Sequence, residues 1–230
     1  MGGPEELGLE LTAVARMAGA DAVGFADMVD GLHPEFHPLT RAVSLGCALP
    51  VDIGGGYVFP DETTVMRLAE ACRAVAACLR WRKRRFFVLP STGEGKTSYC
   101  AALFGRFSHK AAATCAGLGW VGKHGLLVNP DFGSAVLWGT VLTDADLPVG
   151  EPIRQGRCGS CTICREACRA GAVRGREWRR GLEFADLVDL EVCGAQVNRL
   201  QREGKTCCGR CMAACPFNFM ASQQKRIEGA

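Results

Sequence analysis

The cysteines in the last third of the chain constrain its fold more than any other feature of the sequence. Residues 158–168 read CGSCTICREAC, residues 207–216 read CCGRCMAACP, and one further cysteine lies between them at position 193. The first run has the spacing C-x2-C-x2-C-x3-C, which is typical of chains that wrap a four-iron cluster. Three close thiolates of such a run bind three irons, and the fourth ligates a neighbouring cluster. The second run repeats C-x2-C-x3-C, so the two runs predict a pair of clusters.

Eight cysteines match the thiolate count of two [4Fe-4S] clusters. They are Cys158, Cys161, Cys164, Cys168, Cys193, Cys208, Cys211 and Cys215. Structural zinc is an alternative, with two thiolates from each run, but it leaves the remaining cysteines of both runs unexplained. Disulfides are a second alternative; they suit small secreted domains, and no signal peptide opens this sequence.

Composition is typical of a globular protein. The chain has 230 residues, 48% of them hydrophobic and 22% charged, with 14 cysteines and a net charge of +3. No apolar run reaches the ~20 residues of a membrane-spanning helix. With 14 cysteines and no export signal, we expect a protein of the reducing cytoplasm. Basic residues gather at 80–85 and 174–180. These runs are either solvated surface or a docking face for an acidic redox partner or RNA.

Residues 1–150 alternate between helical and strand patterns. We expect helices at 4–19, from Asp61 to Leu79, and at 109–118 after the capping residue Ser108. Short apolar runs predict strands at 21–25, 42–49 and 85–89, and the runs 126–128 and 135–142 predict a hairpin across the turn at Asn129–Gly133. The sequence therefore predicts an α/β domain at 1–150 and a smaller cluster domain at 151–230. We expect one short helix, at 183–190, between the cysteine runs.

Two weaker motifs do not carry a function. Residues 90–98 read PSTGEGKTS, but a phosphate-binding loop needs glycine where Pro90 stands, so a nucleotide triphosphatase is disfavoured. His33 and His37 have the spacing of metal ligands on a helix, but a proline follows each of them. This segment is therefore expected to be a surface loop.

The cysteine runs, together with AGLGWVGKHGLLVNPDFGSAVLWGTVLTDADL at residues 116–147, resemble the epoxyqueuosine reductase family. Members of that family reduce an epoxide on a modified tRNA base and use cobalamin and two [4Fe-4S] clusters. The resemblance implies a nitroreductase-like α/β domain, related to those of reductive dehalogenases, followed by a ferredoxin-like double-cluster domain.

The resemblance also assigns residues. It implies that Cys158, Cys161, Cys164 and Cys215 bind one cluster, and that Cys168, Cys193, Cys208 and Cys211 bind the other. The loop GLGWVGKHG at 117–125 matches the family's segment beside the corrinoid, which makes candidate cofactor contacts of Gly117, Gly119, Trp120, Gly122, Lys123 and His124. On glycine spacing alone, a helix end and a tight turn explain this loop equally well.

The sequence departs from the family pattern in three places. The family's proton-donating aspartate falls within residues 102–114, which contain no carboxylate; His109 and Tyr99 are the candidate replacements. Arg169 stands where the family has proline, and the family's long C-terminal region is missing after residue 230. No catalytic residue is therefore assigned.

Three functions are consistent with these features. The first is an oxidoreductase that receives electrons from a ferredoxin or flavodoxin, passes them through two clusters, and delivers them to a bound corrinoid or to a substrate. The second is a non-catalytic electron carrier, or an accessory subunit that docks on a redox partner such as a corrinoid protein. The third, a tRNA-directed reductase, is weakened by the missing acid and tail.

Overall fold

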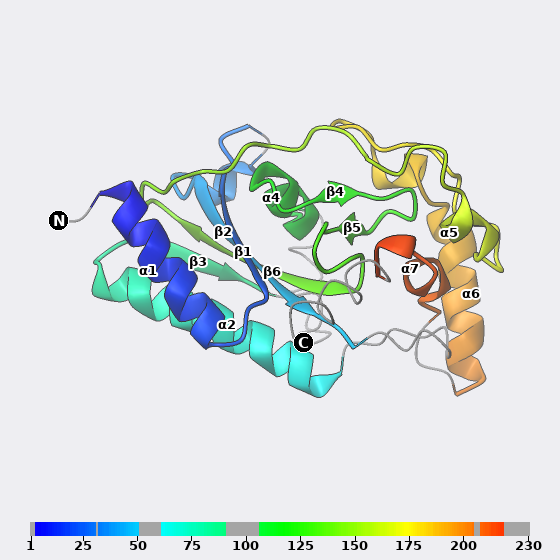
Figure 1. Ribbon diagram of the computed structural model, residues 1–230, viewed down its shortest axis with the longest axis horizontal. Coiled ribbons are helices and arrows are strands. Elements are labelled where there is room, and N and C mark those ends of the chain that lie inside the picture. Colours follow the sequence, from blue (N-terminus) through cyan, green and yellow to red (C-terminus); the bar gives the residue numbers. More distant parts are fainter. Residues whose placement is uncertain (1–2, 31, 51–60, 91–105, 205–207, 219–230) are drawn as a thin grey trace, which may run out of the picture. The chain divides into compact units, whose positions relative to one another are not determined.

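The computed structural model describes residues 3–30, 32–50, 61–90, 106–204 and 208–218 (Figure 1). The chain divides into two compact units. Unit 1 comprises Met1–Ala48, Pro60–Leu118 and Leu137–Ile153, and unit 2 comprises Leu49–Phe59, Gly119–Val136 and Arg154–Ala230. The sequence predicted one boundary after residue 150. The observed division differs mainly in Gly119–Val136, because this segment groups with the cysteine-bearing part.

Unit 1 is built around a sheet of four strands. They are β1 (Ala22–Asp27), β2 (Arg41–Ala48), β3 (Phe86–Leu89) and β6 (Val136–Thr143), in the order β1-β2-β6-β3. β1 and β2 are antiparallel, as are β3 and β6. Every residue of β6 is buried. A strand covered on both faces needs an unbroken apolar run, which VLWGTVLT largely provides.

The helices of unit 1 begin where the sequence predicts. They are α1 (Pro4–Met17), α2 (Glu62–Trp81) and α4 (His109–Cys115), with a 3-10 turn, η1, at Pro34–Phe36. Asp61 accepts a 2.6 Å hydrogen bond from the Thr64 amide, and Ser108 accepts one of 3.3 Å from the Ala111 amide. Among the described residues, no helix combines the length and the apolar character needed to cross a membrane.

Helices cover both faces of this sheet. Phe25 of β1 packs against Gly8 of α1, whereas its neighbour Gly24 faces Leu118, directly after α4. Because successive strand residues point to opposite faces, α1 and α4 lie on opposite sides of the sheet. α2 packs beside α1, and its residue Cys72 lies against Gly139 of β6 (Figure 1). Unit 1 is thus a three-layer α/β structure, as expected.

Unit 2 has shorter elements. They are β4 (Trp120–Val121), β5 (Leu127–Val128), α5 (Ile163–Glu166), the 3-10 turn η2 (Phe184–Asp186), α6 (Leu190–Arg202) and α7 (Arg210–Ala213). β4 and β5 form an antiparallel pair with Trp120 opposite Val128. The predicted pairing of 126–128 with 135–142 is therefore wrong: β5 pairs with β4, and β6 belongs to the sheet of unit 1.

The turn inside that wrong hairpin does form. The amides and carbonyls of Asn129 and Gly133 exchange hydrogen bonds of 2.8 and 2.9 Å, and the Asn129 side chain accepts from the Asp131 amide. Turn chemistry is local and was predicted correctly, but it does not determine which strands continue the pairing.

The predicted helix at 183–190 is also wrong. Glu183 and Asp186 form a capping box at the start of the single 3-10 turn η2. The segment does not extend because its next residues pair with the segment at 172–174: the Arg174 amide donates to the Leu187 carbonyl, and the Asp189 amide donates to the Ala172 carbonyl. The helix starts later, where the Asp189 side chain accepts a hydrogen bond from the Val192 amide. α6 is therefore an element that the sequence interpretation missed, and it carries Cys193.

Candidate functional site

The eight predicted cluster cysteines all lie in unit 2, and none of these eight forms a disulfide. Their positions relative to the helices follow the chain: Cys158 and Cys161 before α5, Cys164 on α5, Cys168 after α5, Cys193 on α6, Cys208 before α7, Cys211 on α7 and Cys215 after α7. The adjacent Cys207 lies outside the described residues.

Four of these sulfurs form what we call the first thiol group: Cys158, Cys161, Cys164 and Cys215. Burial raises the pKa of Cys164 to about 11, and the negative charges of Cys158, Cys215 and Cys161 add to this shift. Burial also raises the pKa of Cys215, with contributions from Cys158 and Cys161. The thiol of the second cysteine run therefore lies among the three of the first.

The other four form the second thiol group: Cys168, Cys193, Cys208 and Cys211. Burial raises the pKa of Cys211 to about 12, and the nearby charges of Cys168, Cys164, Cys193 and Cys208 raise it further. Cys164 also belongs to the first group, so the two groups adjoin. The resemblance implies the same division of the eight residues.

The donor chemistry of both groups suits iron–sulfur clusters. Crowded, desolvated thiols resist ionisation unless cations supply compensating charge, as the irons of a cluster do. Among the described residues, no three His, Cys, Asp or Glu side chains are arranged to hold a single metal ion. The thiols around a cluster bind different irons, so they need not converge on one point.

Lys123 is one of the few charged residues buried in unit 2, and its side chain is 8% exposed. Its Nζ donates hydrogen bonds of 2.6 Å to the Gly159 carbonyl and 3.0 Å to the Cys161 carbonyl. Both acceptors lie in the Cys158–Cys161 turn of the first thiol group. The sequence predicted that Lys123 offsets anionic charge on a cofactor, whereas its donors here are directed at the cysteine loop.

Glu177 completes this arrangement. Its Oε1 accepts a 3.0 Å hydrogen bond from the Cys158 amide, and its Oε2 lies 3.8 Å from the Lys123 Nζ. That second oxygen is buried and makes no hydrogen bond. A side chain at Gly156 would overlap the Glu177 carboxylate, so glycine is needed there for close approach. Sequence reasoning did not identify Glu177.

A polar network supports the other end of the first thiol group. The Asn218 Oδ1 accepts a 2.7 Å hydrogen bond from the Ser134 amide, and its Nδ2 donates one of 2.7 Å to the Met212 carbonyl. Hydrogen bonds from Ser134 and from the Phe217 amide lower the pKa of Cys215 against the effect of burial. The network thus joins the segment after β5 to the α7 segment, and no signal in the sequence pointed to it.

Gly117 is explained by the end of α4. It has a φ of +74°, its amide donates to the Thr114 carbonyl, and the Leu118 amide donates to the Ala113 carbonyl. This pair of bonds is the Schellman motif, which ends many helices at a left-handed glycine. The alternative explanation of this position, a helix end, accounts for its geometry without any ligand.

Residues 119–125 are occupied by contacts within unit 2. A side chain at Gly119 would overlap the Val128 carbonyl, and one at Gly122 would lie 2.9 Å from the His124 ring. Trp120 is 2% exposed and packs edge-on against Phe217, with their ring centroids 5.0 Å apart. The His124 Nδ1 accepts a 3.1 Å hydrogen bond from the Leu126 amide. These contacts fit a structural role, and none of them requires a corrinoid.

His109, a candidate replacement for the missing acid, is fully engaged in unit 1. Its Nε2 donates to the Pro90 carbonyl over 2.9 Å, so its Nδ1 accepts from the Thr140 hydroxyl over 2.8 Å. Burial lowers the pKa of His109. Both ring nitrogens thus have hydrogen-bond partners, which fits a structural role for His109 better than the role of proton donor. Tyr99 and most of the GKT-containing loop lie outside the described residues.

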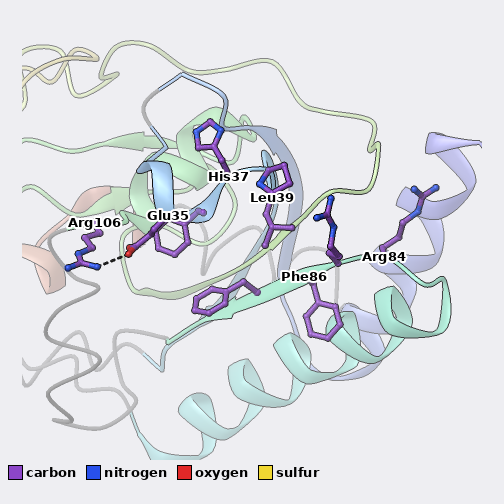
Figure 2. A pocket seen from close by; sticks show the side chains of 10 residues that line it. Glu35, His37, Leu39, Arg84, Phe86 and Arg106 are labelled. Carbon is purple, nitrogen blue, oxygen red and sulfur yellow. Dashed lines mark hydrogen bonds and ion pairs between the residues drawn. The ribbon is translucent and has the colours of Figure 1, made fainter.

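Unit 1 contains a pocket of about 700 Å³ between the segment after β1 and strand β3. Figure 2 shows Glu35, Leu39, Phe86 and Arg84 around it, with Arg106 bonded to Glu35 over 2.6 Å. Its remaining lining residues are Phe36, His37, Pro38, Arg85 and Phe87. None of the candidate site residues predicted from the sequence lines this pocket.

Each of the two basic runs has two arginines in ion pairs within the protein. Arg82 contacts Glu10 over 2.6 Å and Arg85 contacts Asp144 over 2.7 Å. In the second run, Arg174 pairs with Asp189 over 3.1 Å, and Arg176 also bonds a carboxylate. Exposed pairs of this kind contribute little stability. They fit the interpretation of these runs as ordinary solvated surface.

Curated relatives named epoxyqueuosine reductase match about half of the chain. The protein from Vibrio cholerae is 35% identical over 114 residues, which cover 46% of this chain and 29% of the relative. The protein from Gloeobacter violaceus is 33% identical over 135 residues, which cover 53% and 39%. The matched segments thus span well under half of the relatives' length. No protein-family model matches the chain.

Solved structures of two kinds share the fold. An epoxyqueuosine reductase crystallised with a tRNA stem loop superposes with a TM-score of 0.66 at 19% identity, covering 93% of this chain and 65% of that one. A catabolic reductive dehalogenase superposes with a TM-score of 0.69 at 23% identity, covering 94% and 32%. These findings confirm the expected resemblance: the chain is similar in sequence to epoxyqueuosine reductases over about half of its length, and it shares its mixed α/β fold with them and with reductive dehalogenases.

Proposed function

We propose that this chain is an iron–sulfur redox protein that passes single electrons through two [4Fe-4S] clusters to a bound cofactor or substrate. A reduced ferredoxin or flavodoxin gives one electron to one cluster and leaves oxidised. The adjoining cluster takes that electron in turn and delivers it to the acceptor. The similarity to epoxyqueuosine reductases supports redox chemistry of this class.

One observation supports the proposal: seven thiols from two distant cysteine runs and the thiol of Cys193 lie close enough to raise one another's pKa. The charges that raise the pKa of Cys164 and Cys211 come from the members of the two thiol groups. Thiols crowded in this way favour binding of cations, and the C-x2-C-x2-C-x3-C spacing favours iron–sulfur clusters over zinc. In this proposal, unit 2 is a ferredoxin-like domain.

The acceptor that the fold favours is a corrinoid. One reductive dehalogenase with this fold is described as suggesting a mechanism for B12-dependent dehalogenation. A bound corrinoid would supply a strongly reducing cobalt centre. The loop at 119–125 does not select this cofactor by its side chains, because Trp120 and Lys123 are taken up by contacts within unit 2. We therefore propose that the loop contacts the corrinoid through its backbone groups.

Iron analysis tests the proposal directly. Protein purified without oxygen should be brown and contain about eight irons and eight sulfides per chain, the content of two [4Fe-4S] clusters. The Cys193→Ala variant should lose about half of both. Cys72→Ala, which alters a buried cysteine of α2, is the matched control and should keep its full content. Zinc in place of iron, or full iron in Cys193→Ala, would contradict the assignment.

A second candidate function is a non-catalytic electron carrier or accessory subunit. The internal contacts of the 119–125 loop favour it, as does the engagement of both His109 ring nitrogens. Cobalamin added to the anaerobic protein discriminates between the two candidates. Co-elution with an altered absorption spectrum supports the reductase, whereas cobalamin that elutes free supports the carrier.

Reduction of a modified tRNA base is the third candidate. A structural neighbour is an epoxyqueuosine reductase bound to a tRNA stem loop. A binding measurement with a tRNA stem loop therefore belongs in the same experiment. Binding at physiological salt that is lost on substitution of Arg179 and Arg180 would support an RNA substrate, because phosphate contacts dominate nucleic-acid affinity.

A further inference from the structure

We infer that Lys123 is a positioning residue for the first thiol group: it fixes the Cys158–Cys161 turn and raises the redox potential of the cluster held there. The inference rests on the proposed function, since it requires a cluster in the first thiol group. It gives Lys123 a role different from the cofactor contact that the sequence predicted.

The positioning role follows from hydrogen bonds. Within the Cys158–Cys161 turn, the Cys161 amide donates a 3.1 Å hydrogen bond to the Cys158 carbonyl. Gly159, in the same turn, has a φ of +55°. The Lys123 Nζ binds the Gly159 and Cys161 carbonyls from one side, and Glu177 binds the Cys158 amide. Lys123 lies in the turn between β4 and β5, which the Gly125 amide closes by donating to the Gly122 carbonyl. The conformation of the thiol-bearing turn is thereby tied to β4 and β5.

The electrostatic role follows from burial. The Lys123 side chain is 8% exposed, so water screens its charge weakly. Reduction adds one negative charge to a cluster. A cation beside the Cys158–Cys161 turn stabilises that charge and raises the midpoint potential. Glu177, whose Oε2 lies 3.8 Å from the Lys123 Nζ, acts in the opposite direction.

Lys123 is the one Lys or Arg side chain that is buried among the described residues. The basic side chains nearest along the chain to the members of the second thiol group, Arg165, Arg169 and Arg210, are all at least partly exposed. Exposed charges act on a cluster through water and are screened. The inference therefore predicts that the two clusters differ in potential and that Lys123 affects only one of them.

The test is an anaerobic redox titration followed by EPR, with iron analysis of every sample. Lys123→Met should make the first cluster about tenfold harder to reduce at a fixed potential, a downward shift of about 59 mV for a one-electron couple. Lys123→Arg, which keeps the charge, should restore most of the wild-type potential. The matched control Lys83→Met removes a charge from an exposed residue of unit 1 and should shift neither transition.

If Lys123→Met loses the cluster and its potential cannot be measured, the Glu177→Gln variant tests the electrostatic role instead. It keeps an oxygen for the Cys158 amide but removes the negative charge, so the potential should rise. Loss of about four irons in Lys123→Met, with retention in Lys123→Arg, supports the positioning role. Unchanged potentials in Lys123→Met and Glu177→Gln overturn the inference but leave the proposed function standing. A wild-type protein without iron overturns both.

Discussion

The two units reach a stable structure by different means. Unit 1 buries a sheet between helices, and its largest fully buried side chains are aliphatic, such as Leu45, Leu68 and Val141. In the described part of unit 2, only α6 is longer than four residues, and the buried side chains include Cys164 and Cys215. Buried thiols add little apolar area compared with leucine. If the thiols bind clusters as proposed, we expect the stability of unit 2 to depend on those clusters and the stability of unit 1 not to.

Two basic side chains, His109 in unit 1 and Lys123 in unit 2, also differ in their roles. In unit 1, both ring nitrogens of the partly buried His109 are bonded, to Pro90 and Thr140. In unit 2, Lys123 holds a loop of prospective metal ligands. A basic side chain can thus serve the structure of one unit and shape a binding site in the other.

Removal of iron should give the largest effect. Because binding of metal and folding are coupled where ligands gather only in the folded state, the apo protein should lose the structure of unit 2. Hydrogen exchange should show fast exchange at α5, α6 and α7 after chelation, with β6 still protected. Equal loss of protection in both units would mean that the fold of unit 1 also depends on the metal.

Gly133→Ala should weaken unit 2 next most strongly. Gly133 has a φ of +71°, and a Cβ there would overlap the Asn218 side chain and lie 2.8 Å from its Cα. Gly171→Ala is the matched control, with a φ of +68° and open space around it. Both variants share the backbone strain, so Gly133→Ala should cost about 1–3 kcal/mol more in unfolding free energy. Similar losses in the two variants would show that the Asn218 network can move aside.

The pH dependence of unit 1 should report on His109. Burial lowers its pKa below the ordinary 6.5. Below pH 6.5 the unfolded chain binds a proton that the folded unit does not, so stability is complete above this pH and falls as pH decreases towards the folded pKa. The slope is at most about 1.4 kcal/mol per pH unit. Denaturant titrations of His109→Gln should lack this slope, and those of the control His33→Gln, altered in a half-exposed loop residue, should keep it.

Ser134→Ala should have the smallest effect. Ser134 lowers the pKa of Cys215 through a hydrogen bond, so it stabilises negative charge on that sulfur. Its loss should lower the potential of the first cluster by less than Lys123→Met does, because a neutral hydroxyl contributes less than a buried charge. Redox titration measures this shift. A shift larger than that of Lys123→Met would make hydrogen bonding to sulfur the stronger influence.

Local signals in the sequence were sufficient for much of unit 1. The capping residues Asp61 and Ser108 and the apolar runs located its helices and strands, because each of these signals acts within a few residues. The partner of β6 could not be predicted in this way, since strand pairing is decided by contacts far along the chain. α6 was missed because its residues are mostly exposed, with Leu200 as its one buried residue, although Asp189 offered a capping signal.

The candidate site was predicted unevenly. Cysteine spacing is a strict geometric requirement, so it made seven of the eight thiols candidate ligands, whereas Cys193 was added to complete the count of eight. Lys123 was singled out for its glycine-rich surroundings, but the sequence did not reveal which carbonyls it binds. Glu177 and Asn218 act through contacts with distant segments, and no pattern marks residues of that kind.

Cys215 belongs to the first thiol group although it lies far along the chain from the other three members, and this has a consequence for biosynthesis. In the proposed assignment, a cluster in the first thiol group draws Cys158, Cys161 and Cys164 from one segment and Cys215 from about fifty residues further along. A ribosome delivers that last ligand after the first three, since the chain emerges in order from the N-terminus. Cluster assembly would therefore wait until Cys215 has been made, when all four described strands of unit 1 have already been translated.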